Sequence, residues 1–174
     1  MKKWSKKVWM STAAVLIAIM SVSAIPASAD TSRVIWFTIQ NNSVCSTSGH
    51  YTTVYINLNN ISSSAANVTV NLYNDDGVAV TATGLPASGG GYMASTFQPG
   101  SPFMLGGKQT KHYYAAFGTF PGGSTCENRP AYGNIVVDDS GLLLANGEIK
   151  GTSSGSTTII LSNTNIIING GQPF

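Results

Sequence analysis

The sequence predicts an all-β protein, a single antiparallel β-sandwich or jelly roll of about ten short strands that follows a cleaved signal peptide. Three observations support this fold. No window after Asp30 has helical periodicity. Runs rich in Val, Ile, Thr, Tyr and Phe alternate with clusters of Gly, Asn, Ser and Pro. The chain also contains two cysteines, which suits an exported domain held by a disulfide.

The first 29 residues have the organisation of a secretory signal peptide. Four lysines lie within the first seven residues, an apolar stretch follows, and the segment ends in Ala27-Ser28-Ala29. We expect cleavage between Ala29 and Asp30, which leaves residues 30–174 as one β-sandwich domain that is secreted or held at the cell surface, with no stable membrane span. The alternative is an uncleaved membrane anchor, because the apolar stretch approaches the length of a spanning helix. Pro26 and the small residues at the site favour cleavage.

Charge is scarce and excludes some functions. Only 9% of the residues are charged, against about 25% in ordinary soluble domains. From Asp30 onward the chain has five basic and seven acidic residues, a net charge of −2 (five minus seven). Nucleic-acid binding needs clustered Lys and Arg, so we expect no nucleic-acid partner.

The clearest strands are residues 51–59 and 66–73, in which apolar residues occupy every second position. The side chains predicted to point inward are Val54, Ile56 and Leu58 in the first strand, and Val68, Val70 and Leu72 in the second. Asp76-Gly77 then favours a tight turn. Residues 78–83 are the expected return strand of a hairpin that begins at residue 66.

Further strands are expected over 34–40, 92–97, 108–117, 134–138, 142–150, 156–161 and 165–168. Residues 34–39 and 166–168 are apolar on both faces. One interpretation is a strand buried centrally beneath covering loops. The other is that the N-terminal strand pairs with a neighbouring subunit by strand addition, which makes Val34, Trp36 and Phe37 the candidate assembly strand.

Cys45 and Cys126 are the only cysteines. One pair in an exported chain is most simply an intramolecular disulfide, which would close a loop of about 80 residues and stabilise the fold by roughly 4 kcal/mol. The alternative is a cross-link between subunits. The spacing fits neither zinc binding nor a redox motif.

No catalytic or metal-binding constellation emerges, and we expect a protein that is not an enzyme and carries no cofactor or metal. His50 and His112 are the only histidines, and no nucleophile elbow accompanies them. The acidic pairs Asp75-Asp76 and Asp138-Asp139 lie near glycines, as tight turns require. Calcium binding at these turns is the alternative.

A candidate binding face comprises the outward side chains of the two clearest strands, namely Tyr51, Tyr55, Asn57, Asn71 and Tyr73. Aromatic rings beside amides suit sugars, which present C–H patches and hydroxyl groups together. They also suit a neutral protein contact, in which Tyr is enriched. Strand propensity alone favours Tyr as well.

The N-terminal Met1-Lys2-Lys3-Trp4-Ser5-Lys6-Lys7 resembles the signals of exported proteins of Gram-positive, Bacillus-type bacteria, and residues 67–77 resemble small immunoglobulin-like β-sandwich modules of bacterial surface proteins. The resemblance implies an exported binding or structural module and assigns no catalytic residue. We therefore predict a non-enzymatic structural or adhesive protein of the cell or spore surface or extracellular matrix, whose partners are itself or other surface proteins. The alternatives are a carbohydrate-binding module that uses the Tyr/Asn face on a polysaccharide, and a secreted hydrolase or inhibitor.

Overall fold

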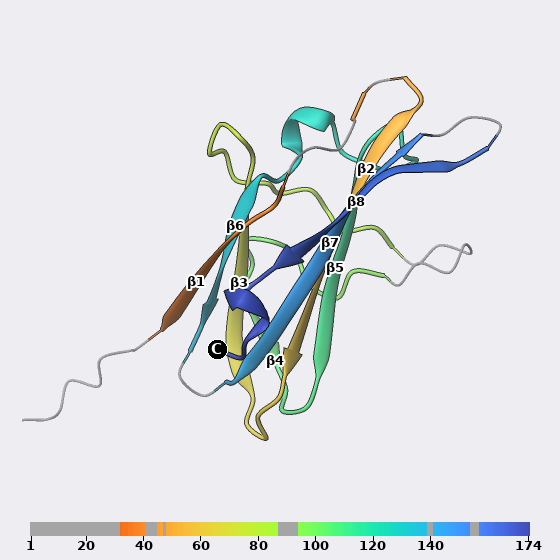
Figure 1. The fold of residues 1–174 in the computed structure, drawn as a ribbon. Coiled ribbons are helices and arrows are strands. Elements are labelled where there is room, and N and C mark those ends of the chain that lie inside the picture. The colour runs from red at the N-terminus through yellow and green to blue at the C-terminus, as the bar shows by residue number, and fades with distance from the viewer. Residues whose placement is uncertain (1–31, 41–44, 47, 87–93, 139–140, 154–156) are drawn as a thin grey trace, which may run out of the picture.

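The computed structural model contains two antiparallel four-stranded sheets packed face to face (Figure 1), which confirms the predicted β-sandwich. It describes residues 32–40, 45–46, 48–86, 94–138, 141–153 and 157–174. The predicted signal peptide and its cleavage position between Ala29 and Asp30 lie outside the described residues. Within the described residues, no helix is long and apolar enough to cross a membrane.

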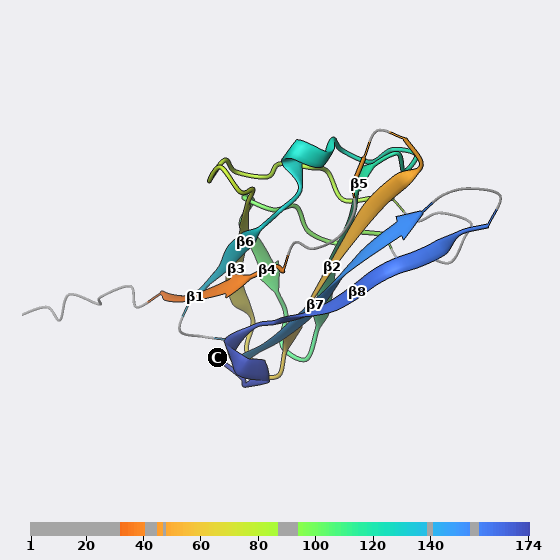
Figure 2. The same ribbon diagram turned by 45° about the horizontal axis from the view of Figure 1, so that its top comes forward.

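Each sheet combines strands that are distant in the sequence. Sheet A has the order β1 (Arg33–Thr38), β6 (Tyr132–Val137), β3 (Ala66–Tyr73) and β4 (Phe103–Leu105). Sheet B has the order β5 (Thr110–Gly118), β2 (His50–Asn60), β7 (Leu143–Ser153) and β8 (Ile159–Ile167). Two short 3-10 helices, η1 (Cys126–Asn128) and η2 (Asn169–Gly171), follow β5 and β8 (Figure 2).

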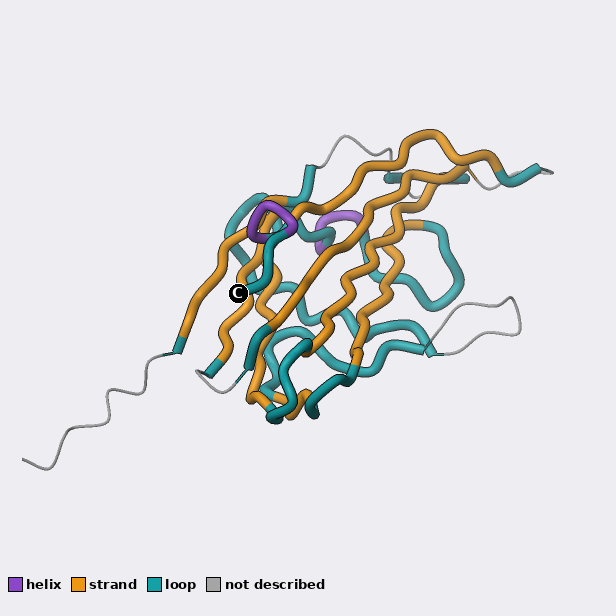
Figure 3. The backbone as a smooth tube through the Cα atoms, turned by 60° about the horizontal axis from the view of Figure 1, so that its bottom comes forward, coloured by secondary structure: helices purple, strands orange, loops and turns teal. Residues whose placement is uncertain are grey.

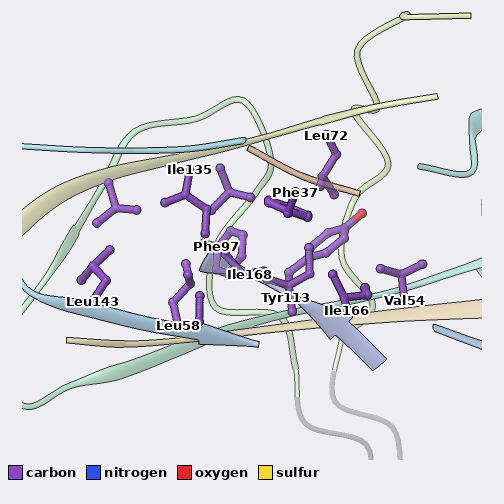
Figure 4. Packing of buried hydrophobic residues seen from close by; sticks show 14 of the residues in the cluster. Phe37, Val54, Leu58, Leu72, Phe97, Tyr113, Ile135, Leu143, Ile166 and Ile168 are labelled. Atoms are coloured by element: carbon purple, nitrogen blue, oxygen red, sulfur yellow. The ribbon is translucent and has the colours of Figure 1, made fainter. Parts of the chain in front are cut away.

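The core lies between the sheets and follows the predicted alternation. All six side chains predicted to point inward from residues 51–59 and 66–73 are at most 1% exposed. Figure 4 shows Leu72 and Ile135 extending from sheet A toward Leu58 and Val54 of sheet B. Because every second residue of each strand faces this layer, the remaining residues of β2 and β3 point outward, in opposite directions.

The predicted hairpin of residues 66–83 is wrong beyond its turn. The turn itself forms: the Asn74 side-chain oxygen accepts hydrogen bonds from the backbone N–H groups of Asp76 and Val78 (3.1 and 2.8 Å), and Gly77 has φ +78°. The return segment then makes one isolated bridge to β3 and forms no strand. The return segment finds no free strand edge, because the backbone hydrogen-bonding groups of β3 are already used. β6 pairs along one side of β3, while β4 and the backbone N–H of Gly100 bond to the other side.

The structure has eight strands among its described residues, where the sequence predicts about ten. Residues 159–161 and 165–167 of the two predicted strands 156–161 and 165–168 belong to one strand, β8, because backbone pairing with β7 continues through the polar residues between them, while residue 156 lies outside the described residues. Residues 94–97, the described part of predicted strand 92–97, are not a strand. β4 was not predicted, since its three residues lie between breakers.

The first predicted strand is an edge strand and is not buried centrally. β1 pairs only with β6 among the described strands, so one of its sides is open. Phe37 and Ile39 enter the core, whereas Val34 and Trp36 are 46% and 61% exposed. The C-terminal apolar run behaves in the same way, since Ile167 is 67% exposed between two buried isoleucines. In both segments the second apolar face is therefore exposed to solvent and is not covered by a second layer among the described residues.

Cys45 and Cys126 form one disulfide within the chain, with 5.8 Å between their Cα atoms, as predicted. The bridge ties the segment before β2 to η1, and the Cys45 sulfur lies 3.3 Å from the carbonyl oxygen of Phe117 at the end of β5. It therefore fastens one end of the sandwich, where segments 81 residues apart meet.

Candidate functional site

The outer face of sheet A carries three aromatic side chains from three neighbouring strands, Trp36 of β1, Tyr132 of β6 and Tyr73 of β3, called here the aromatic cluster. The ring centroids of Tyr73 and Tyr132 are 5.1 Å apart, and each lies 6.3 Å from that of Trp36. The strand register explains the cluster, because Tyr132 pairs with Tyr73 on one side and with Thr38 on the other. Cross-strand neighbours on one face lie within reach of each other's rings.

An amide pair adjoins the aromatic cluster. Asn134 of β6 lies opposite Trp36 on one side and Asn71 on the other, so the three side chains form a row across the sheet. The Asn71 amide nitrogen donates a hydrogen bond of 2.9 Å to the Asn134 side-chain oxygen. This bond uses one donor of Asn71 and the acceptor of Asn134, and because Asn134 is only 5% exposed, the pair presents mainly the half-buried Asn71 on this face.

A groove of about 670 Å³ begins at the aromatic cluster and runs between the edges of the two sheets. Its walls come from β1 and the start of β6 on one side, and from the end of β8 and η2 on the other. The lining residues are Trp36, Phe37, Thr38, Ala131, Tyr132, Ile167, Asn169 and Gly170. None of them is charged, so the groove suits neutral chemistry.

The predicted five-residue binding face does not exist as one surface. Tyr51, Tyr55 and Asn57 lie on β2 in sheet B, whereas Asn71 and Tyr73 lie on β3 in sheet A. The two strands follow one another in the chain but belong to different sheets. Their outward side chains therefore point to opposite sides of the sandwich.

The two halves of that predicted face have different surroundings. On sheet B, Tyr55 stacks on His112 with 6.0 Å between ring centroids, and Tyr51 contacts Phe120 edge to face at 5.0 Å. Burial, and secondly the negative charge of Glu148, raise the pKa of Tyr55. On sheet A, Tyr73 belongs to the aromatic cluster. The sheet A half combines clustered rings with a groove.

The four edge strands differ in how they are protected. β4 has only three residues, and short edges resist unwanted pairing. β5 is covered, because the backbone N–H groups of Leu85 and Thr96 donate to the carbonyl oxygens of Tyr114 and His112 (2.7 and 2.8 Å). Among the described residues, no strand pairs with the outer side of β1 or of β8.

β8 is the more apolar of the two open edges. Ile159, Ile160, Leu161 and Ile167 are 55%, 60%, 46% and 67% exposed. Strands β7 and β8 extend beyond the end of sheet A (Figure 1 and Figure 3), so no described strand of sheet A packs against the first part of β8. After Lys150 the sequence contains no charged residue.

The titratable residues highlighted by the sequence are dispersed. His50 accompanies Ser46, with 3.1 Å between its Nδ1 and the serine hydroxyl, while His112 lies on β5 against Tyr55. The Asp138 carboxylate accepts hydrogen bonds from the backbone and side chain of Asn67 (3.0 and 2.9 Å). Asp139 lies outside the described residues. Within the part of the chain that is described, no three His, Cys, Asp or Glu residues gather as a metal site would require.

No protein-family model, curated protein or solved structure is significantly similar to the chain. The resemblance to immunoglobulin-like surface modules therefore stays a prediction. The residues that sequence reasoning missed are Tyr132 and the exposed Ile159, Ile160 and Leu161 of β8, whereas the doubly apolar run 166–168 was recognised. An uncharged, β-prone C-terminal run was the available signal for β8. No local sequence signal points to Tyr132, because strand order determines which residues lie beside it.

Proposed function

We propose that the protein is an exported, non-enzymatic structural or adhesive protein of the cell surface or extracellular matrix, which associates with copies of itself through β8. The observation that carries this proposal is the open, apolar and uncharged edge of sheet B. The disulfide supports export, because such bonds persist in oxidising compartments.

Edge protection is the first argument. Natural proteins protect sheet edges with short strands, charged residues, prolines or covering loops. This chain uses a short strand at β4 and a covering segment at β5. Residues 157–168, which contain β8, have no charge, no proline and no glycine. Such a sequence readily accepts another strand.

The exposed aliphatic side chains provide the driving force. Full burial of a large aliphatic side chain stabilises by about 1.5–3 kcal/mol. Covering the exposed 60% of Ile160 therefore contributes about 1–2 kcal/mol. Ile159 and Ile167 have similar exposures. Each of them adds a comparable amount, together with the backbone hydrogen bonds that a new strand forms.

The geometry of the edge limits what β8 can build alone. Antiparallel pairing of β8 with β8 of a second copy about a two-fold axis joins two B sheets into one, and such an interface closes as a dimer. Growth beyond a dimer needs another contact. β1 is the second open edge, which gives the candidate assembly residues Val34 and Trp36 a role, while Phe37 belongs to the core.

Lysine substitutions test the proposal. Ile160→Lys places a charge at the β8 edge, and Met104→Lys is the matched control, because Met104 is 65% exposed on the short edge strand β4. We expect Ile160→Lys to lower the associated fraction at least tenfold in sedimentation velocity, with an unchanged circular dichroism spectrum. Met104→Lys should associate like the wild type. Equal behaviour of both variants contradicts the proposal.

Val34→Lys tests the role of β1. If β1 supports growth beyond the dimer, this variant stops at dimers joined through β8, whereas Ile160→Lys retains only the contact made through β1. A substitution is preferable to deletion of residues 30–39, since deletion also removes Phe37 and Ile39 from the core. Wild-type-sized assemblies of Val34→Lys would assign growth to a surface other than β1.

A further inference from the structure

We infer that the aromatic cluster and its groove bind a neutral polysaccharide, with Trp36 as the principal contact. The aromatic cluster lies on sheet A, away from the exposed start of β8, although the groove reaches the end of β8 at Ile167 and Trp36 also belongs to the β1 edge. It also differs from the Tyr/Asn face expected from the sequence, because Trp36 and Tyr132 are central to it and Tyr55 is not.

Trp36 is exposed yet held in place. It is 61% exposed, although its ring lies 6.3 Å from both Tyr73 and Tyr132. The two tyrosines restrict the orientation of the indole, while the open side of β1 leaves much of its surface accessible. A binding group that is already ordered loses little conformational entropy when its ligand arrives.

The surrounding groups match the chemistry of a sugar. A pyranose ring presents a patch of polarised C–H groups, which pack on the electron-rich face of an aromatic ring. Its hydroxyl groups need hydrogen-bond donors and acceptors nearby. The half-buried Asn71 lies in the row that contains Trp36, and its side-chain oxygen accepts no hydrogen bond in the amide pair, whereas Asn134 is only 5% exposed and chiefly holds Asn71 in place.

Charge selects a neutral polymer over a charged one. The groove lining contains no Lys, Arg, Asp or Glu. Asp75 and Asp76 follow Tyr73 in the turn after β3, and Arg129 offsets the charge of Asp75, so this turn has no excess of positive charge that would attract an anionic chain.

Retention on three insoluble neutral polysaccharides, cellulose, chitin and curdlan, tests the inference. All variants are measured in the Ile160→Lys background, which removes association through β8, and the molar mass of each is measured alongside, so that a change in association through β1 is not mistaken for a change in binding. We expect retention on at least one of the three. Trp36→Ala should weaken it at least tenfold, Trp36→Tyr should restore part of it, and an anionic polygalacturonate gel should retain nothing.

Two matched controls make the test specific. Met104→Ala removes an exposed apolar side chain from another strand of sheet A, and Tyr55→Ala removes a predicted contact from sheet B. Both should bind like the parent. From residue 30 onward Trp36 is the only tryptophan, so tryptophan emission from the exported chain should shift when a soluble oligosaccharide of the retained polymer is added.

Three outcomes overturn the inference. The parent could be retained on none of the polysaccharides, or Trp36→Ala could bind as well as Met104→Ala. Alternatively, Trp36→Ala in the wild-type background could reduce self-association and leave retention unchanged, which would identify this face as an interface between copies of the chain.

Discussion

Removal of the disulfide should destabilise the protein severely. The bond closes a loop between residues 81 apart in the sequence. The chain-entropy expression for a loop of this length gives about 15 cal/mol/K, or about 4.5 kcal/mol at 25 °C. Ordinary domains have only about 5–15 kcal/mol in total. The double substitution Cys45→Ala with Cys126→Ala should therefore remove a large share of the stability.

Urea unfolding followed by circular dichroism measures this loss. We expect the double variant to unfold at a much lower urea concentration than the wild type, and the reduced wild type to behave like the variant. The double substitution leaves no free thiol, so intermolecular oxidation cannot complicate the comparison. A loss below about 1 kcal/mol would refute the reasoning that the bridge constrains the unfolded chain. A wild type that migrates as a disulfide-linked dimer would refute the intramolecular pairing itself.

Three further predictions concern the core. Leu58→Ala should cost about 2–5 kcal/mol in urea unfolding, because Leu58 is fully buried and truncation leaves a cavity. Gly133→Ala should cost about 1–3 kcal/mol in the same assay, since a Cβ there would lie 2.7 Å from the Phe37 ring. Burial raises the pKa of Tyr113 far above 10.0. Above about pH 10 the unfolded chain therefore releases a proton that the folded chain keeps. As a result, the free energy of unfolding falls by up to about 1.4 kcal/mol per pH unit. Tyr113→Phe should reduce the loss of stability with rising pH without abolishing it, because the pKa of Tyr55 is also raised. Urea unfolding at increasing pH measures this dependence, and an unchanged dependence in the variant would show that Tyr113 is not responsible.

Local features of the fold could be predicted from the sequence. β3 spans Ala66–Tyr73, as expected, and β2 extends the expected strand by one residue at each end. Strict alternation of apolar and polar residues identifies both, because one face of each strand is buried and the other is not. The disulfide was predictable for a different reason, since two cysteines allow only one intramolecular pair.

Strand order could not be predicted, and the candidate site depends on it. Asp76-Gly77 indicates a turn, but it does not determine whether the following residues pair with β3. In the structure β6 and β4 flank β3, although both come much later in the chain. This order brings Tyr132 beside Trp36 and Tyr73. It also separates Tyr55 from Tyr73, which local periodicity alone had placed on one face.

The polar interruption in β8 shows a second limit. Four polar residues, 162–165, separate two apolar runs and suggest two short strands, yet backbone pairing to β7 continues through them. Backbone hydrogen bonds depend little on the side chain where the strand is exposed to solvent. Consequently the length of the open edge, on which the proposed self-association depends, became clear only from the sheet register.

The most direct test of the central claim is the molar mass of the exported wild-type protein. We would measure it by size-exclusion chromatography with light scattering, near neutral pH and without reductant, over a series of protein concentrations. Self-association through β8 predicts a mass of two or more chains that rises with concentration, with no covalent link between chains. The mass of a single chain at every concentration would contradict the account.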